Sequence, residues 1–166
     1  MTITMPATTL RMEQAQFDAI RRHGEETYPH ECCGVLLGRA ETGANTVVEA
    51  VPAGNTRIDS AHNRYSIAPQ ELIRIQRDAR RQELDIVGFY HSHPDHPAQW
   101  SQTDLAEAHW FGCSYVITSV IGRGEPEKGS ARCRATDTNS FLLTGAGEED
   151  KRLEPQAIEV AAPVSA

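Results

Sequence analysis

The segment from His91 to Asp104, with the sequence HSHPDHPAQWSQTD, carries the residue types and spacing most informative about chemistry. His91 and His93 are one residue apart, so on a β-strand both imidazoles point to the same face. Asp104 follows downstream, where the next element can turn its carboxylate back towards them. Two imidazoles and one carboxylate are three protein ligands for zinc, and a three-ligand site keeps a fourth position for water. Because zinc lowers the pKa of bound water to about 7, the pattern indicates a hydrolytic metal centre.

Ser101 and Asp104 have a second interpretation that needs no metal. The pattern S-x-x-D before a helix is typical of a capping box, in which the serine caps backbone amides and the acid reaches back. The two interpretations can coexist, because the start of a helix fixes the direction of the residue three positions inside it. His96 competes as a ligand, but its place in a turn between Pro94 and Pro97 favours an exposed loop residue.

The bulk properties limit the classes of protein to be considered. A chain of 166 residues suits one domain, expected over 1–144, followed by an acidic, partly flexible tail over 145–166. The net charge of −7 argues against broad binding of nucleic acid, and no apolar run reaches the length of a membrane span. The first residues have no basic segment followed by an apolar stretch, so we expect no secretory signal and a cytoplasmic location.

The four cysteines form no C-x-x-C pair. In a reducing cytosol they are expected to be small buried residues, namely Cys32, Cys33, Cys113 and Cys133. A thiol near an active site is the alternative for Cys32 and Cys33.

Hydrophobic periodicity and turn residues predict a mixed order of helices and strands. Helices are expected from Glu13 to before Pro29, from Pro69 onwards, and from Ser101 to about Phe111. Strands are expected at 9–12, 33–38, 45–51, 64–67, 85–93, 113–121, 131–135 and 141–144, with a possible docked strand at 158–160. The longest candidate loop is 52–63, and 122–129 is expected to be a turn. This order predicts the α/β (α+β) class, a mixed sheet with helices packed on it.

The predicted strand 85–93 positions the chemistry. Its continuous apolar run from Ile86 to Tyr90 is typical of a central strand covered on both faces. It delivers His91 and His93 at its end, where Pro94 stops the regular structure.

These residues resemble the JAMM (MPN-plus) metalloprotease family, also known as Mov34/JAB. The family motif is a distant upstream Glu, then H-[S/T]-H-P, six residues, and S-x-x-D. Here His91-Ser92-His93-Pro94 precedes six residues and Ser101-Gln102-Thr103-Asp104 without a gap. In bacterial members the upstream acid lies in a P-x-E-x-C-G-x-L-x-G segment, which corresponds to 29–38 and places the acid at Glu31. The similarity extends over residues 12–141.

The resemblance implies a JAMM/MPN fold, with a curved mixed central sheet flanked by helices and an architecture like that of cytidine deaminases. It implies that His91, His93 and Asp104 hold one zinc ion. Glu31 would be the general base, and Ser101 would donate a hydrogen bond to the substrate carbonyl as charge develops on it. The deaminase signature H-x-E with P-C-x-x-C is absent from the sequence, so deaminase chemistry is not expected.

Two further residues are candidate substrate contacts. Bacterial relatives often have proline before the motif serine, whereas this chain has Trp100, which either lines the substrate cleft or covers the start of the helix. Asn55 lies in the loop 52–63, and long loops often carry substrate contacts.

The resemblance also implies a substrate class. JAMM enzymes cut amide bonds next to the C-terminal Gly-Gly of ubiquitin-like proteins, and deubiquitinases use inserted segments for recognition. This compact chain offers a modest first insertion at 52–63, and 122–129 is too short for a large second one. The leading hypothesis is therefore a peptidase acting on a small ubiquitin-like sulphur-carrier protein, releasing cysteine or trimming C-terminal residues. The alternatives are an isopeptidase that removes such a modifier from lysine and a metal-free MPN scaffold; no oligomeric state is indicated.

Overall fold

The computed structural model describes residues 9–56, 66–124 and 131–162. Its elements follow in the order β1 (Thr9–Glu13), α1 (Gln14–Thr27), β2 (Cys33–Glu41), β3 (Ala44–Ala53), α2 (Pro69–Arg81), β4 (Asp85–Pro94), α3 (Gln102–Glu107), β5 (Ser114–Gly122), β6 (Cys133–Thr144) and β7 (Arg152–Ala161). None of the helices in the described ranges is long and apolar enough to span a membrane.

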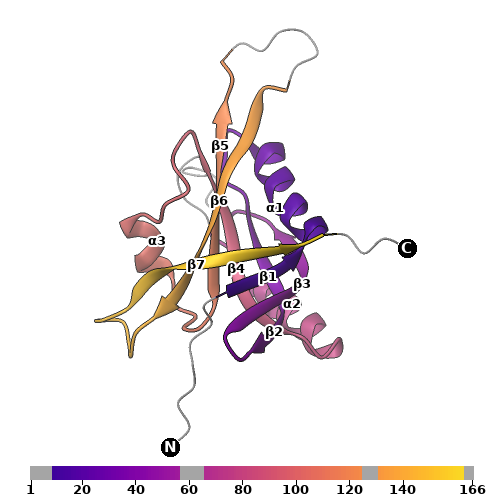
Figure 1. Ribbon diagram of the computed structural model, residues 1–166, viewed down its shortest axis with the longest axis vertical. Coiled ribbons are helices and arrows are strands. Elements are labelled where there is room, and N and C mark those ends of the chain that lie inside the picture. The colour runs from indigo at the N-terminus through magenta and orange to yellow at the C-terminus, as the bar shows by residue number, and fades with distance from the viewer. Residues whose placement is uncertain (1–8, 57–65, 125–130, 163–166) are drawn as a thin grey trace, which may run out of the picture.

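The strands form one mixed sheet, which closes into a barrel in the order β1-β3-β2-β4-β5-β6-β7. The pairs β1–β3, β1–β7 and β4–β5 are parallel, and the others are antiparallel. The predicted mixed α/β class is therefore confirmed, and the sheet closes on itself because β7 returns to β1. In Figure 1, β1 and β7 run crosswise to β4, β5 and β6.

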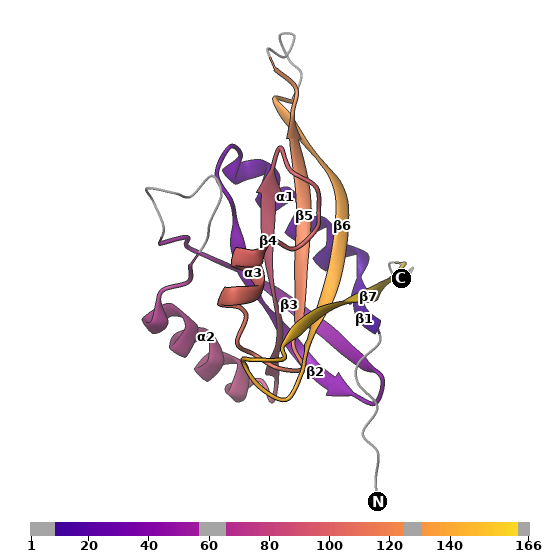
Figure 2. The ribbon, with the colours of Figure 1, turned by 90° about the vertical axis from the view of Figure 1, so that its left-hand side faces the viewer.

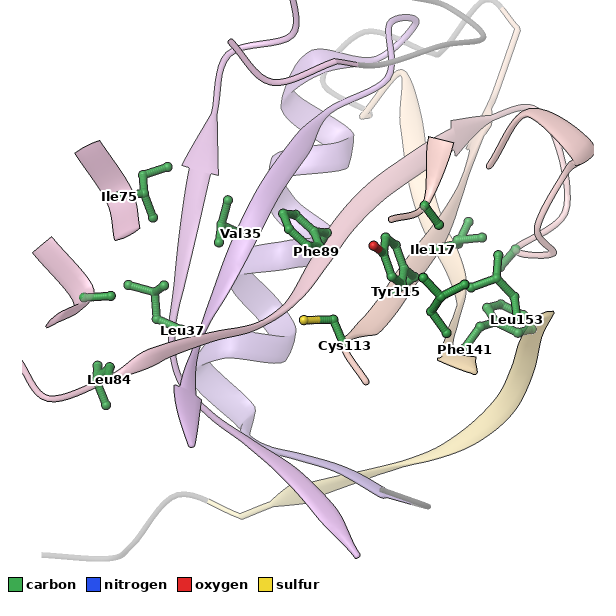
Figure 3. Close-up of a cluster of buried hydrophobic side chains, with 14 residues drawn as sticks. Val35, Leu37, Ile75, Leu84, Phe89, Cys113, Tyr115, Ile117, Phe141 and Leu153 are labelled. Carbon is green, nitrogen blue, oxygen red and sulfur yellow. The ribbon is translucent and has the colours of Figure 1, made fainter. Parts of the chain in front are cut away.

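Helices cover the sheet on two sides, over two clusters of buried side chains. α1 and α3 lie on opposite sides of β4–β6 (Figure 1), and α2 and α3 lie on the same side (Figure 2). Under α1, Ile20 packs with apolar residues that include Leu36 and Tyr90. Under α2, Ile75 packs in the larger cluster of Figure 3, which includes Phe89 and Tyr115. Burial on both sides explains the unbroken apolar run of β4.

Several predicted boundaries are wrong, each because of a contact distant in sequence. The strands expected at 131–135 and 141–144 are one strand, β6. The polar residues between them have partners inside the fold: the Thr138 hydroxyl lies 3.0 Å from that of Thr118, and Ser140 Oγ donates to Gln156 Oε1 at 2.7 Å. These bonds let a polar stretch continue through the sheet.

α3 ends at Glu107 instead of near Phe111. The Lys151 ammonium donates to the carbonyls of Ala106 and Ala108 at 3.2 and 2.9 Å, and so satisfies acceptors at the end of the helix. Of the strand expected at 64–67, residues 64 and 65 lie outside the described residues, and Ser66 and Ile67 are not in a strand. Parts of the loop 52–63 and of the turn 122–129 also lie outside them, and Ala53 belongs to β3.

β7 contains the strand predicted at 158–160 and is longer than predicted. It pairs with β1 through Thr9–Glu13 and with β6 through Ser140–Thr144. The sheet therefore includes a strand beyond residue 144, where the sequence predicts that the domain ends and the tail begins.

Candidate metal centre

The pairing of β2 with β4 brings Glu31 to the histidines. In this antiparallel ladder Cys33 lies opposite His91, and residues that face each other have side chains on the same face of the sheet. Continuing the register by two residues places Glu31 next to His93. The adjoining pair is fixed by two hydrogen bonds, from Cys32 N to Ser92 Oγ at 2.8 Å and from Ser92 N to Cys32 O at 3.3 Å.

Three side chains converge on one point at the end of β4. His91 Nε2 and His93 Nε2 lie 3.1 Å apart. The Asp104 carboxylate closes the group, with Oδ1 3.2 Å from His91 Nε2 and Oδ2 3.2 Å from His93 Nε2. The structure therefore brings together the three residues that the sequence motif proposes as ligands.

Asp104 also takes part in the capping box of α3. Ser101 N donates to Asp104 Oδ2 at 2.8 Å, and Asp104 N donates to Ser101 Oγ at 3.1 Å. The same carboxylate oxygen faces His93, so the capping and the ligand interpretations coexist. The cap fixes the direction in which the carboxylate points.

The spacing of these atoms fits a tetrahedral metal ion. With ligand bonds of 2.0–2.1 Å, neighbouring ligands around zinc are about 3.3 Å apart, close to the 3.1 and 3.2 Å separations here. His93 Nδ1 lies 2.9 Å from the Pro97 carbonyl oxygen, which selects the tautomer with the proton on Nδ1 and leaves Nε2 as an electron-pair donor.

Glu31 forms a second possible set with the histidines. One oxygen of Glu31 lies within 4.8 Å of both imidazoles, which allows a Glu-His-His group instead of the Asp-His-His group. Asp104 is in closer contact with both rings, which favours it over Glu31 as the third ligand. Glu31 is 3% exposed, and among the described residues its Oε2 is buried without a hydrogen-bond partner. A buried polar atom without a partner is rare in a folded protein and is one mark of a functional site.

Burial and charge shift the pKa values of this group in different directions. Burial raises the pKa of Glu31 to about 8, with smaller raising contributions from Asp104 and Glu107 and a lowering one from His93. Burial also opposes the charged form of Asp104, but its hydrogen bonds with His91 and His93 outweigh this and hold its pKa well below the usual range. Perturbed carboxyl groups in one cluster are typical of a functional site.

The two imidazoles respond differently to the same carboxylate. Burial lowers the pKa of His91 despite its hydrogen bond with Asp104. For His93 burial also acts to lower the pKa, but the hydrogen bonds with Asp104 and the Pro97 carbonyl outweigh it, so the pKa is raised. A neutral, buried His91 is in the form that binds a cation.

Trp100 and Asn55, the two candidate substrate contacts, both make contacts within the fold. Trp100 is partly buried and packs against the larger core cluster. Asn55 Nδ2 donates to the Glu31 carbonyl at 3.3 Å, and its Oδ1 accepts from Ser66 N at 3.0 Å. Asn55 therefore holds the backbone that carries Glu31.

His96 is exposed, as the sequence predicts, and its carbonyl accepts a hydrogen bond from Ser119 at 2.7 Å. The four cysteines are buried and free, also as predicted. Burial raises the thiol pKa of Cys32 and of Cys33 to about 12, so neither is a reactive thiolate at neutral pH.

The sequence does not reveal how two supporting groups act. Ser92 lies between the histidines, but its bond to Cys32 depends on the pairing of β2 with β4. The Pro97 carbonyl orients His93 through the turn after β4. Each contact joins a side chain to a backbone atom, and residue identity does not reveal which backbone atom it meets.

Comparisons with known proteins place this geometry in a family. The chain is 35% identical over 123 residues to the desampylase of Haloferax volcanii, covering 72% of this chain and 86% of that one. It is 30% identical over 113 residues to the probable TtuB-protein conjugate cleaving protease of Thermus thermophilus, covering 68% and 72%.

Two solution structures have similar folds. A Desulfitobacterium hafniense protein superposes with a TM-score of 0.70 at 26% identity, covering 93% of this chain and 94% of that one. A Salinibacter ruber protein gives a TM-score of 0.62 at 33% identity, covering 90% and 91%. Residues 13–135, which include Glu31 and the whole histidine–aspartate motif, match the family of prokaryotic homologs of the JAB domain. The chain therefore belongs to that family and is a JAMM-type hydrolase of peptide or isopeptide bonds.

Proposed function

We propose that this protein is a zinc-dependent peptidase that hydrolyses the amide bond after the C-terminal Gly-Gly of a small ubiquitin-like sulphur-carrier protein. The observation that carries the proposal is the convergence of His91, His93 and Asp104 beside the buried Oε2 of Glu31, which has no hydrogen-bond partner in the described part of the chain. The metal-free scaffold is disfavoured because all ligand positions are kept and their atoms meet at tetrahedral spacing.

His91, His93 and Asp104 would hold the zinc ion. When bound, zinc supplies a water of lowered pKa and polarises the substrate carbonyl. The hydrogen bond between His93 and the Pro97 carbonyl and the cap on Asp104 keep the ligand atoms in place before the metal arrives.

Glu31 is the group that moves the proton. Its Oε2 accepts a proton from the attacking water and delivers it to the departing amine, which must leave in a protonated form. A carboxyl group suits this exchange when its pKa lies near the working pH, and burial already raises the pKa of Glu31 to about 8.

Ser101 supplies a hydrogen bond to the substrate carbonyl oxygen. Its Oγ accepts from Asp104 N, which leaves the hydroxyl hydrogen to be donated outward. One such donor is worth about 3 kcal/mol of barrier when it meets the developing negative charge.

The names of the relatives favour conjugates as a second kind of substrate. One relative is called a desampylase and the other a probable protease that cleaves TtuB–protein conjugates. An isopeptidase acting on a carrier joined to lysine uses the same groups as a peptidase acting on a carrier joined to cysteine. The two differ only in the leaving amine.

The test uses zinc-loaded protein and two adducts of one ubiquitin-like carrier ending in Gly-Gly, joined either to cysteine or to the side chain of a lysine peptide. Release of the carrier with a free Gly-Gly terminus, followed by mass spectrometry, supports the proposal, and the ratio of the two rates decides between the candidates. The Glu31→Gln protein is the matched control. Absence of cleavage of both adducts by protein with bound zinc would overturn the proposal.

A further inference from the structure

A pocket of about 290 Å³ lies next to the metal centre. Residues of β4, β5, α2 and the end of α3 contribute to its wall, among them Ile67, Leu72, Phe89, Glu107, Trp110 and Tyr115. Phe89 is two residues before His91 on β4, so the two side chains share a face. Glu107 is one helical turn after Asp104, and Tyr115 pairs with Phe89 across β4–β5. The pocket therefore continues the site along the direction of β4.

The aromatic wall of this pocket is rigid. Phe89 stacks on Tyr115 with ring centroids 5.5 Å apart, and it meets Trp110 edge-on at 5.4 Å. Figure 3 shows Phe89 and Tyr115 next to each other in the larger core cluster. The Tyr115 hydroxyl accepts a hydrogen bond from Trp110 N at 3.1 Å, which fixes the ring further. A side chain entering the pocket meets a preformed surface.

The residues that line the pocket suit one kind of substrate side chain. Glu107 brings a carboxylate to a wall that is otherwise mostly apolar and aromatic. His109, also at the wall, lies 2.9 Å from Glu148 Oε1, so its ring is directed to that carboxylate. Aromatic faces and one carboxylate together suit a long apolar stem that ends in a positive charge, as in lysine or arginine.

The spacing of Phe89 and His91 along β4 indicates which substrate residue reaches the pocket. Two residues of extended chain span about 7 Å, which is the separation of His91 and Phe89 along β4. The two glycines before the scissile bond have no side chains and cover this distance. We propose, on the basis of the function proposed above, that the pocket binds a lysine or arginine side chain at the carrier residue immediately before Gly-Gly. This residue is common to every adduct of one carrier, whatever amine leaves.

Binding of cleaved carrier tails tests this without turnover. Fluorescent peptides ending in Arg-Gly-Gly, Met-Gly-Gly and Glu-Gly-Gly are titrated with the zinc-loaded protein and followed by anisotropy. Methionine keeps the apolar stem without the charge. We expect the arginine peptide to bind about tenfold more tightly than the glutamate peptide, with methionine between them.

Variants of Glu107 separate the charge from the shape of the pocket. In the Glu107→Gln protein, the arginine and methionine peptides should bind with similar affinity. In the Glu107→Arg protein, the glutamate peptide should bind more tightly than the arginine peptide. Glu41→Gln, at the exposed far end of β2, is the matched control and should leave the order unchanged. An order that is the same in all four proteins overturns the inference.

Cleavage of adducts distinguishes failure of the two proposals. If no Gly-Gly adduct is cleaved, the proposed function fails. If adducts are cleaved but Glu107 variants change only the preference for the leaving residue, the function stands and the assignment of the pocket is wrong.

Discussion

Ser101 and Asp104 hydrogen-bond each other reciprocally at the start of α3, while the Asp104 carboxylate still lies 3.2 Å from each of two imidazoles. One side chain therefore takes part in the start of a helix and in the proposed metal centre. A metal ligand that is also a helix cap is held in one direction before any ion binds.

Substitution of each partner separates the two roles. Asp104→Ala should weaken zinc binding by at least about 100-fold, because even changes behind the ligands cost 10- to 100-fold. Ser101→Ala should remove about 1 kcal/mol of capping free energy and keep the zinc. Zinc stoichiometry by elemental analysis and urea unfolding in chelator measure the two effects. If the Asp104→Ala protein binds as much zinc as the wild type, the carboxylate acts only in the helix cap.

Glu31→Gln should keep zinc but lose hydrolysis, because it removes the proton acceptor and leaves His91, His93 and Asp104 intact. The rate is expected to fall by about 10²- to 10⁴-fold. Cleavage of a carrier adduct and zinc content are measured on the same preparation, with Glu41→Gln as a control for the loss of one carboxylate. Near-normal turnover by the Glu31 variant would assign the proton transfer to another group.

The contribution of Glu31 to the free energy of unfolding of the chelated protein should fall as the pH rises from 4.5 to about 8, because the pKa of Glu31 is 4.5 when unperturbed and about 8 in the folded chain. In that window the folded state binds the proton more tightly than the unfolded state, so raising the pH favours unfolding. Glu31 alone contributes a slope of at most about 1.4 kcal/mol per pH unit.

The Glu31→Gln protein isolates this contribution, because it keeps the neighbouring His91, His93 and Asp104. Urea unfolding at several pH values gives the difference between the two curves. The wild-type curve should fall relative to the variant's across the window. Parallel curves would mean that the folded carboxyl keeps an ordinary pKa.

Ser92→Ala should destabilise the fold by about 1–3 kcal/mol, since it leaves the buried Cys32 amide without its acceptor. It should also lower kcat, because Cys32 follows Glu31 directly. Ser140→Ala is the matched control: Ser140 is also buried on a strand and bonds to Gln156, away from the site. Equal losses of stability with a loss of activity only in Ser92→Ala would support a role in placing Glu31.

The sequence is most informative where its signals are local. The apolar run before His91 predicts β4 correctly, and His91, His93 and Asp104 lie close enough in sequence for their spacing to suggest convergence. Glu31 is different. Its approach to His93 depends on the pairing of β2 with β4, which periodicity does not reveal, and only the family resemblance singles it out.

The missed boundaries have a common physical cause. The polar stretch of β6 has partners in Thr118 and Gln156, and the carbonyls at the end of α3 have one in Lys151, all from other parts of the chain. Local secondary-structure propensity does not include such distant partners, and tertiary contacts can override it. The pocket beside the metal centre is likewise invisible in sequence, since it is assembled from four separate elements.

The parallel pairing of β1 with β7 has a consequence for biosynthesis. On the ribosome, β1 emerges more than 130 positions before its neighbour β7, so the nascent chain carries an open sheet edge until β7 has been made. Such distant pairing slows folding. Shortened chains that lack 152–161 are therefore expected to accumulate as aggregates in expression trials, even though every proposed catalytic side chain has already been made.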